Sequence, residues 1–346
     1  MKITEKEPSL QHSLDNWTGG TVIEPFNWRA YNNSQTREKV MFLELLNDLC
    51  NVLDENSYCG TGRKPKSLSH QVFCVCLREY VGLSSRRVIS DLEISKRNHF
   101  ISETPHFNTV LNYLGNINVK RALIYLIQLS ALPLAQLEDK FAIDSTGFGE
   151  RKYIEKWSSV RQKPYMYRLY RKAHCIYGTY SNAVVSAIIT EGTEADSPKF
   201  IELLNNASKN FDVKEITADL GYSSRENMKY AEQLGVTPYI PFKKNATGTS
   251  RGATIWHKMY KYFKDNREEF LKHYHIRSNA ESGFFMIKSR FGDFVKTKTS
   301  LSQTNEILAK ILCHNICVLI QEIYLSNIDI DFISSAEKYR DPKTNF

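Results

Sequence analysis

The sequence lacks the features that would place the protein in a membrane or outside the cell. Its 346 residues include seven cysteines, an odd number without a disulfide-framework spacing, which suits a reducing compartment. No apolar run approaches the roughly 20 residues that a membrane helix needs, and the polar N-terminus carries no apolar leader. We therefore expect a cytoplasmic protein without a membrane partner.

Acidic residues are almost missing from the stretch 151–172. Glu155 is its single carboxylate against eight cations, an excess of seven that nearly equals the net charge of +8 for the whole chain. Tyrosines alternate with these cations, a texture typical of nucleic-acid surfaces, although a solvated loop can have the same composition. The cations that we assign to DNA are Arg151, Lys152, Arg161, Lys163, Arg168 and Lys172.

The first part of the chain has the pattern of a helical region. Residues 1–33 are polar and are expected to form an arm, and 34–137 are expected to form a helical domain. A break in the pattern contains Arg63 and Lys64, in a basic loop that can follow phosphates or serve as a solvated linker. The expected helices span 36–53, 68–80 and 84–92, with a further helix opened by Thr104 as cap and Pro105 in the first turn.

The last of these helices has one apolar side and one polar side. Val110, Leu111 and Leu114 are expected to face inward. Three short helices with a polar-faced last one fit a helix-turn-helix reader of DNA, and a helical bundle without DNA contact fits equally well. The polar side carries His106, Asn108, Thr109 and Asn112, of which we assign His106, Asn108 and Asn112 to DNA binding.

From Lys140 the pattern changes to strands that alternate with helices, which predicts an α/β domain over 138–325. Asp144 and Asp219 each follow a short apolar strand, at the carboxyl ends where α/β sheets place their sites. A short helical insert is expected at about 244–272, and a polar tail at 326–346. The expected strands span 141–144, 167–177, 183–190, 213–218 and 236–241, and the helices 197–208, 223–234 and 307–319.

Four polar residues between Tyr274 and Lys288 share one stripe of an expected helix. Tyr274, Arg277, Glu281 and Lys288 fall within about 60° of one another at 100° per residue, which leaves Phe284, Phe285 and Ile287 for burial. Taken alone, this is the pattern of a solvated helix face with Arg–Glu pairing. Together with Asp144 and Asp219, it gives the hard oxygen ligands that Mg²⁺ or Mn²⁺ needs in phosphoryl transfer.

These motifs resemble the DDE transposases of prokaryotic insertion sequences, in the group with a Tyr-x2-Arg-x3-Glu-x6-Lys motif. Tyr274, Arg277, Glu281 and Lys288 match that spacing at every position, behind two aspartates that end strands. The segments Lys172-Ala-His174 and Thr190 to Asp196 also resemble the family. The likeness covers roughly residues 60–325.

The resemblance implies a ribonuclease-H-like mixed sheet flanked by helices. It implies that Asp144, Asp219 and Glu281 are catalytic and hold two Mg²⁺ or Mn²⁺ ions, that Arg277 and Lys288 bind DNA phosphates, and that Tyr274 positions the terminal strand. The expected partners are terminal inverted repeats, target DNA and a second copy of the chain in a synapse, in a prokaryotic nucleoid. The expected reaction is cutting of the element's ends and joining of the freed 3′-hydroxyls to target DNA. A non-cutting DNA-binding protein derived from a transposase, and a structure-specific nuclease on the same fold, are the alternatives.

Overall fold

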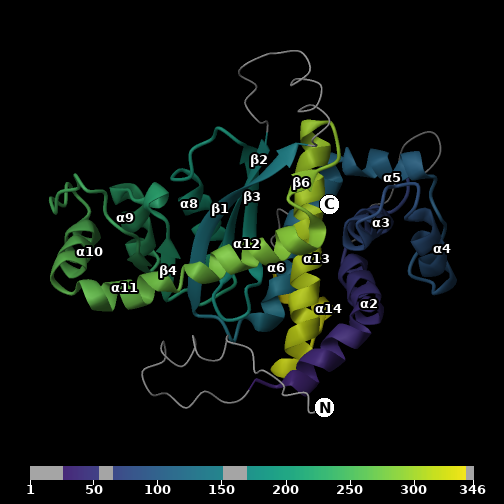
Figure 1. The fold of residues 1–346 in the computed structure, drawn as a ribbon, viewed down its shortest axis with the longest axis horizontal. Coiled ribbons are helices and arrows are strands. Elements are labelled where there is room, and N and C mark those ends of the chain that lie inside the picture. The colour runs from purple at the N-terminus through teal and green to yellow at the C-terminus, as the bar shows by residue number, and fades with distance from the viewer. Residues whose placement is uncertain (1–25, 54–64, 151–169, 340–346) are drawn as a thin grey trace, which may run out of the picture.

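The structure is a computed structural model that describes residues 26–53, 65–150 and 170–339. A mixed sheet stands at the centre, helices cover both of its faces, and the N-terminal helices pack to one side (Figure 1). The N-terminal helices are α2 (Trp28–Asn51), α3 (Leu68–Val81), α4 (Ile89–Arg97), α5 (Phe107–Leu114) and α6 (Ile117–Ala131).

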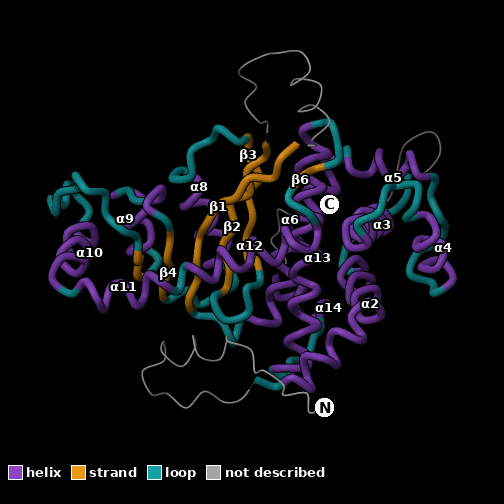
Figure 2. Tube along the Cα trace, in the orientation of Figure 1, coloured by secondary structure: helices purple, strands orange, loops and turns teal. Residues whose placement is uncertain are grey.

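The sheet has the order β3-β2-β1-β4-β5, with a short sixth strand beside β1 (Figure 2). Strand β1 pairs antiparallel with β2 and parallel with β4, and β2 pairs antiparallel with β3. These directions and this order are those of a ribonuclease-H-like sheet, so the expected fold class is confirmed. The strands are β1 (Lys140–Glu150), β2 (Tyr170–Gly178), β3 (Val184–Glu191), β4 (Glu215–Ala218), β5 (Thr237–Tyr239) and β6 (Phe294–Val295).

Alternation along the strands divides the apolar residues between two cores. Phe141 and Ile143 of β1 pack with α8 and α9, whereas Ala142 and Phe148 face the layer of α12, α13 and the N-terminal helices. The remaining helices are α8 (Lys199–Ser208), α9 (Arg225–Gln233), α10 (Thr254–Asp265), α11 (Arg267–His275), α12 (Ser278–Phe291), α13 (Ser300–Leu325) and α14 (Phe332–Tyr339). Helices α10 and α11 lie where the helical insert is expected.

Helix α13 is the shared support of the two halves of the molecule, standing between the sheet and the N-terminal helices (Figure 1). By length and hydropathy it could cross a membrane, so the sequence-based statement that no such run exists is wrong. Its most apolar window, however, is 78% buried inside the protein, which identifies it as a core helix.

Several expected boundaries differ from the structure. Helix α2 begins at Trp28, so the last residues of the expected arm are helical. Helix α4 begins at Ile89 rather than at 84, because residues 84–88 form a turn. Helix α5 begins at Phe107, and the side chain of His106 rather than Thr104 caps it. Leu111 is 42% exposed, since Val110, Tyr113 and Leu114 fill the buried side.

Asn315 ties three elements together at the buried side of α13. Its Nδ2 donates to the Val184 carbonyl at 2.8 Å and to Ser130 Oγ at 2.9 Å, and its Oδ1 accepts from the Val184 N–H at 2.9 Å. Helix α6, strand β3 and α13 are therefore held in register by one fully buried amide.

We predict that Asn315→Ala lowers the free energy of unfolding by roughly 2–4 kcal/mol, because it strands buried backbone groups of Val184 without partners. Urea unfolding followed by circular dichroism measures the change. The matched control is Gln321→Ala on the half-buried side of the same helix, for which we expect a change within about 0.5 kcal/mol. Equal midpoints for the two variants would contradict the role of Asn315.

Candidate active site

The site forms at a gap along one edge of β1. Strand β4 pairs with β1 only as far as Ile143, and β6 pairs with it again at Gly149. Between these points β1 has β2 alone as a neighbour. Asp144 lies at the start of this gap, and Asp219 follows β4 directly, one residue beyond the pair Ile143–Ala218. The register therefore sets the two aspartates side by side.

The sequence pattern indicated that Asp144 ends its strand, and this is wrong. Strand β1 continues for six residues beyond Asp144, because pairing with β2 holds the segment from Ser145 to Gly149 in extended form. The side chain of Asp144 accepts from the Ser145 N–H at 2.9 Å. Asp219 caps the short helix η2 (Leu220–Tyr222), accepting from the Leu220 N–H at 2.6 Å.

Helix α12 crosses the sheet close enough to bring Glu281 to the same place. Gly283 permits the approach: a Cβ at this position would lie 2.4 Å from the ring of Tyr177 on β2. The neighbouring Phe284 packs edge-on against that ring, with centroids 5.1 Å apart. Gly292, at φ 86°, then ends the helix and turns the chain into β6. Glu281 therefore lies two residues before Gly283, the residue at which α12 packs closely on Tyr177.

Arg277 lies between two of the three carboxylates. Its guanidinium contacts Asp144 Oδ2 at 3.3 Å and forms an ion pair with Glu281. Arg277 precedes α12, and the tight turn at Ile276 and Arg277 separates α11 from α12, so the expected single helix is in fact two. Tyr274 remains beside Arg277, with its ring 5.8 Å from the guanidinium carbon.

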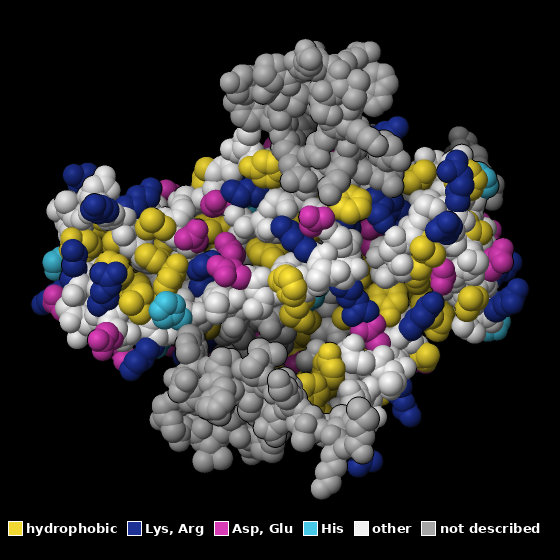
Figure 3. All heavy atoms as spheres, viewed as in Figure 1, with side chains coloured by type: hydrophobic (Ala, Val, Ile, Leu, Met, Phe, Trp, Pro, Cys, Tyr) yellow, Lys and Arg dark blue, Asp and Glu magenta, His cyan; other side chains and the backbone are white. Residues whose placement is uncertain are grey.

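The surroundings of Asp144 disfavour its ionised form. Burial raises the pKa of its carboxyl, the Ser145 N–H and Arg277 counter that rise, and the charges of Asp219 and Glu281 add to it. The three carboxylates therefore interact with one another, and Arg277 is the cation that offsets their repulsion. Figure 3 shows acidic and basic side chains next to one another on the face where α12 crosses the sheet.

Lys288 stands further along α12, over the continuation of β1. Its Nζ donates to Thr146 Oγ1 at 2.6 Å and lies 5.4 Å from the centroid of the Phe148 ring. Burial lowers the pKa of this ammonium group. The exposed Phe285, at 71%, departs from the expected burial, because Gly283, Phe284 and Ile287 occupy the side of α12 that packs on the sheet.

A second polar cluster lies on β2 and the loop after β3. Asp196 pairs with Lys172 Nζ at 2.6 Å, its Oδ1 lies 3.2 Å from His174 Nδ1, and His174 Nε2 is 2.9 Å from Thr190 Oγ1. Burial lowers the pKa of His174 to about 4, so the imidazole is neutral at pH 7. Lys172 forms this ion pair, and its assignment to DNA binding stays a prediction. The segments from Lys172 to His174 and from Thr190 to Asp196 are part of the family resemblance, but the sequence did not predict that their side chains form a cluster.

The other residues assigned to DNA fall into two groups. His106, Asn108 and Asn112 are exposed on α5 and at its cap, as expected. The remaining cations lie outside the described residues, so their assignment stays a prediction: Arg63, Lys64, Arg151, Lys152, Arg161, Lys163 and Arg168.

The donor chemistry of the site suits a hard divalent cation, because Asp144, Asp219 and Glu281 offer only carboxylate oxygens. Burial chiefly raises the pKa of Asp144 and the charges of Asp219 and Glu281 add to that rise, and a bound cation would offset both effects. In the arrangement shown, no three His, Cys, Asp or Glu side chains of the described residues form a metal-binding group. Arg277 supplies the positive charge between Asp144 and Glu281 instead.

Comparison with known proteins gives a domain match and a likeness to solved structures. Residues 135–316, which contain all three carboxylates, match the family model described as a transposase DDE domain. No curated protein matches. Among solved structures, the chain is similar to a cryo-EM structure of a piggyBac transposase synaptic complex with hairpin DNA. The identity is 12% and the TM-score 0.40, over 88% of this chain and 80% of that chain.

We predict that Asp144→Asn unfolds at a higher denaturant concentration than the wild type when both are measured at neutral pH with a chelator. A carboxyl whose pKa is raised in the folded state destabilises that state once it is ionised, and the amide removes the charge. The sign of the effect sets its pH dependence: the difference between the two proteins shrinks as falling pH protonates Asp144. A lower midpoint for Asp144→Asn at neutral pH would contradict the claim that ionised Asp144 destabilises the folded state.

Proposed function

The chain belongs to the transposase DDE domain family, and from that premise we propose that it cuts the ends of an insertion sequence and joins the freed 3′-hydroxyls to target DNA. The convergence of Asp144, Asp219 and Glu281 at the gap in β1 supports this proposal most strongly. The match of Tyr274, Arg277, Glu281 and Lys288 to the Tyr-x2-Arg-x3-Glu-x6-Lys motif favours the prokaryotic insertion-sequence group, and hence a cytoplasmic, nucleoid-associated protein.

The carboxylates would hold Mg²⁺ or Mn²⁺, two ions by the family resemblance. Bound there, the metal would activate water or a 3′-hydroxyl and stabilise the leaving oxygen in an in-line displacement. The protein itself supplies oxygen ligands from three elements. Sheet register and the packing of Gly283 on Tyr177 fix the spacing of these elements. Precise placement of this kind is itself a large contribution to phosphoryl transfer.

Arg277 is suited to exchange its partners when DNA binds. Its planar guanidinium now contacts two carboxylates, and the same fork can hold a phosphate in a bidentate manner. Lys288 lies further along α12 and would contact a neighbouring phosphate. Tyr274 would position the terminal strand. Two ends held in one synapse would require two copies of the chain, so the proposal includes a homodimer on DNA.

Two alternatives lead to different products. A DNA-binding protein derived from a transposase would bind the ends without cutting them. A structure-specific nuclease would cut without joining. Full sets of metal ligands are not needed for binding alone, so the presence of all three carboxylates favours an enzyme.

We predict that Glu281→Gln lowers the cleavage of DNA carrying the terminal inverted repeats by at least about 100-fold, because a ligand that stabilises transition-state charge is lost. Binding of the same DNA should stay within about threefold of the wild type, a change of less than about 1 kcal/mol. Gel analysis of end-labelled DNA with Mg²⁺ measures cleavage, and fluorescence anisotropy measures binding.

Glu268→Gln on the exposed side of α11 is the control and should cut as the wild type does. Retained cutting by Glu281→Gln would remove Glu281 from the site. An inactive wild type would favour the binding protein, and cut products that are never joined to target DNA would favour the nuclease.

A further inference from the structure

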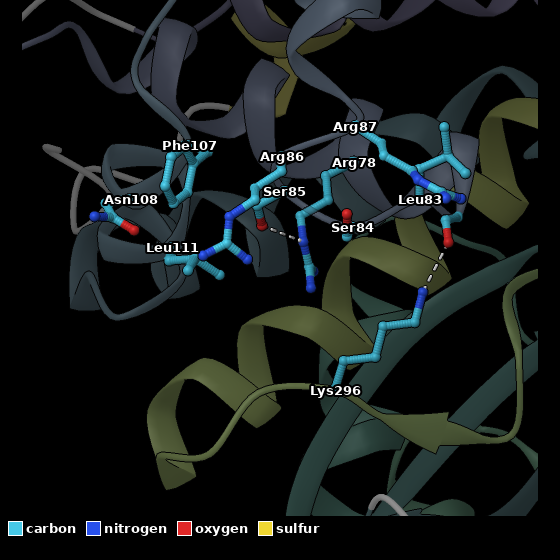
Figure 4. A pocket seen from close by; sticks show the side chains of 11 residues that line it. Arg78, Leu83, Ser84, Ser85, Arg86, Arg87, Phe107, Asn108, Leu111 and Lys296 are labelled. Atoms are coloured by element: carbon cyan, nitrogen blue, oxygen red, sulfur yellow. Dashed lines mark hydrogen bonds between the residues drawn. The ribbon is translucent and has the colours of Figure 1, made fainter.

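A cavity of about 590 Å³ lies where the N-terminal helices meet the catalytic domain, away from the three carboxylates. Its size is within the range of clefts that hold small ligands or parts of larger ones. One wall comes from the end of α3 and the turn that follows, another from α5, and the third from the segment after β6 (Figure 4). The lining residues are Arg78, Gly82, Leu83, Ser84, Ser85, Arg86, Arg87, Phe107, Asn108, Leu111 and Lys296.

Four cations line this cavity, and none of the described residues that line it is acidic. Arg86 and Arg87 are exposed, and within the described part of the chain neither is paired with a carboxylate. Lys296 reaches across from the catalytic domain and donates to the Gly82 carbonyl at 2.8 Å. The cavity therefore concentrates positive charge that its own walls leave largely unneutralised.

Arg78 is the buried cation of the cavity, and it donates to Ser85 Oγ at 3.1 Å and pairs with Glu79. Burial raises the pKa of Glu79, and the charge of Arg78 counters that rise. Hydroxyls of Ser84 and Ser85 add neutral donors between the cations.

The wall that α5 forms is partly apolar. The guanidinium carbon of Arg86 lies 4.6 Å from the centroid of the Phe107 ring, which orients the fork of donors toward the cavity. Leu111, exposed against the sequence-based expectation, continues this wall, and the amide of Asn108 stands beside it (Figure 4). Cations next to an apolar surface and an amide suit a phosphodiester together with the sugar and base that it carries.

The cavity is within reach of the same DNA as the candidate active site. Glu281 precedes the end of α12 by ten residues, and Lys296 follows that end by five residues of chain, so the Cα atoms of Glu281 and Lys296 lie at most about 35 Å apart. That span corresponds to about ten base pairs of B-form DNA. One duplex end can therefore contact both places.

We propose that this cavity is a phosphodiester-binding site that binds the backbone of the terminal DNA within about ten base pairs of the cut. Arg86, Arg87 and Lys296 hold the phosphates, and Phe107 and Leu111 pack against the attached sugar. The inference rests on the proposed function for the identity of the DNA. It adds a second anchoring point that joins the N-terminal helices and the catalytic domain on a single duplex.

The test compares the salt dependence of DNA binding in Arg86→Gln/Arg87→Gln and in a control, Lys209→Gln/Lys229→Gln, whose exposed lysines lie on the α8–α9 side of the sheet. The probe is a duplex of about three helical turns that carries the terminal repeat, and anisotropy is read between about 0.05 and 0.2 M salt. Loss of two phosphate contacts should lower the slope of log K against log salt by about 1.8. Lines that meet near 1 M salt then give binding roughly 60-fold weaker at 0.1 M. The control should keep the wild-type slope.

A second measurement changes the DNA instead of the protein. Neutral methylphosphonates placed within about ten base pairs of the cut should weaken binding by the wild type and leave binding by Arg86→Gln/Arg87→Gln nearly unchanged. Equal losses in both proteins would overturn the proposal even if the arginine variant were misfolded.

Binding and cutting are scored separately, so the two proposals fail in different ways. If the wild type cuts DNA but the arginine variant binds with the wild-type slope, the cavity is not a DNA site and the catalytic proposal stands. If the variant loses its contacts while the wild type never cuts, the cavity is a DNA site and the catalytic proposal falls. In the expected case, a higher DNA concentration restores cutting by Arg86→Gln/Arg87→Gln, because its defect is in binding.

Discussion

The burial of Asp144 beside Asp219 and Glu281 is the constraint on which the site depends. Burial raises the pKa of Asp144, the charges of the other two carboxylates add to that rise, and the guanidinium of Arg277 offsets it. Such a site stores unfavourable electrostatic energy, and the rest of the fold must supply the rigidity to keep it. Sheet register holds the two aspartates, and close packing of α12 on Tyr177 holds the glutamate.

Ion pairs and hydrogen bonds also link the site to the N-terminal helices. Arg290, at the end of α12, pairs with Glu38 of α2, whose carboxylate also accepts from Tyr80 of α3. Buried Lys310 of α13 donates to the Phe294 carbonyl of β6 at 2.7 Å, so the segment that leads to Lys296 is fixed as well. Helix α12 is therefore braced at both ends, and the basic cavity and the carboxylates belong to one continuous scaffold.

The order of strands and helices and the three carboxylates could be predicted from the sequence, because apolar alternation and motif spacing are local signals. The continuation of β1 past Asp144 could not, since residues 145–149 have the composition of a turn and are extended only by pairing with β2. The break at Ile276 and Arg277 gave no signal either. The basic cavity combines residues 78–111 with Lys296, a long-range contact that no spacing encodes.

The most direct test of the central claim is a crystal structure of the protein with Mn²⁺, located by its anomalous scattering. The account predicts Mn²⁺ coordinated by oxygens of Asp144, Asp219 and Glu281, with the guanidinium of Arg277 moved off Asp144. A metal ion bound elsewhere, with Arg277 still between Asp144 and Glu281 at saturating Mn²⁺, would contradict it.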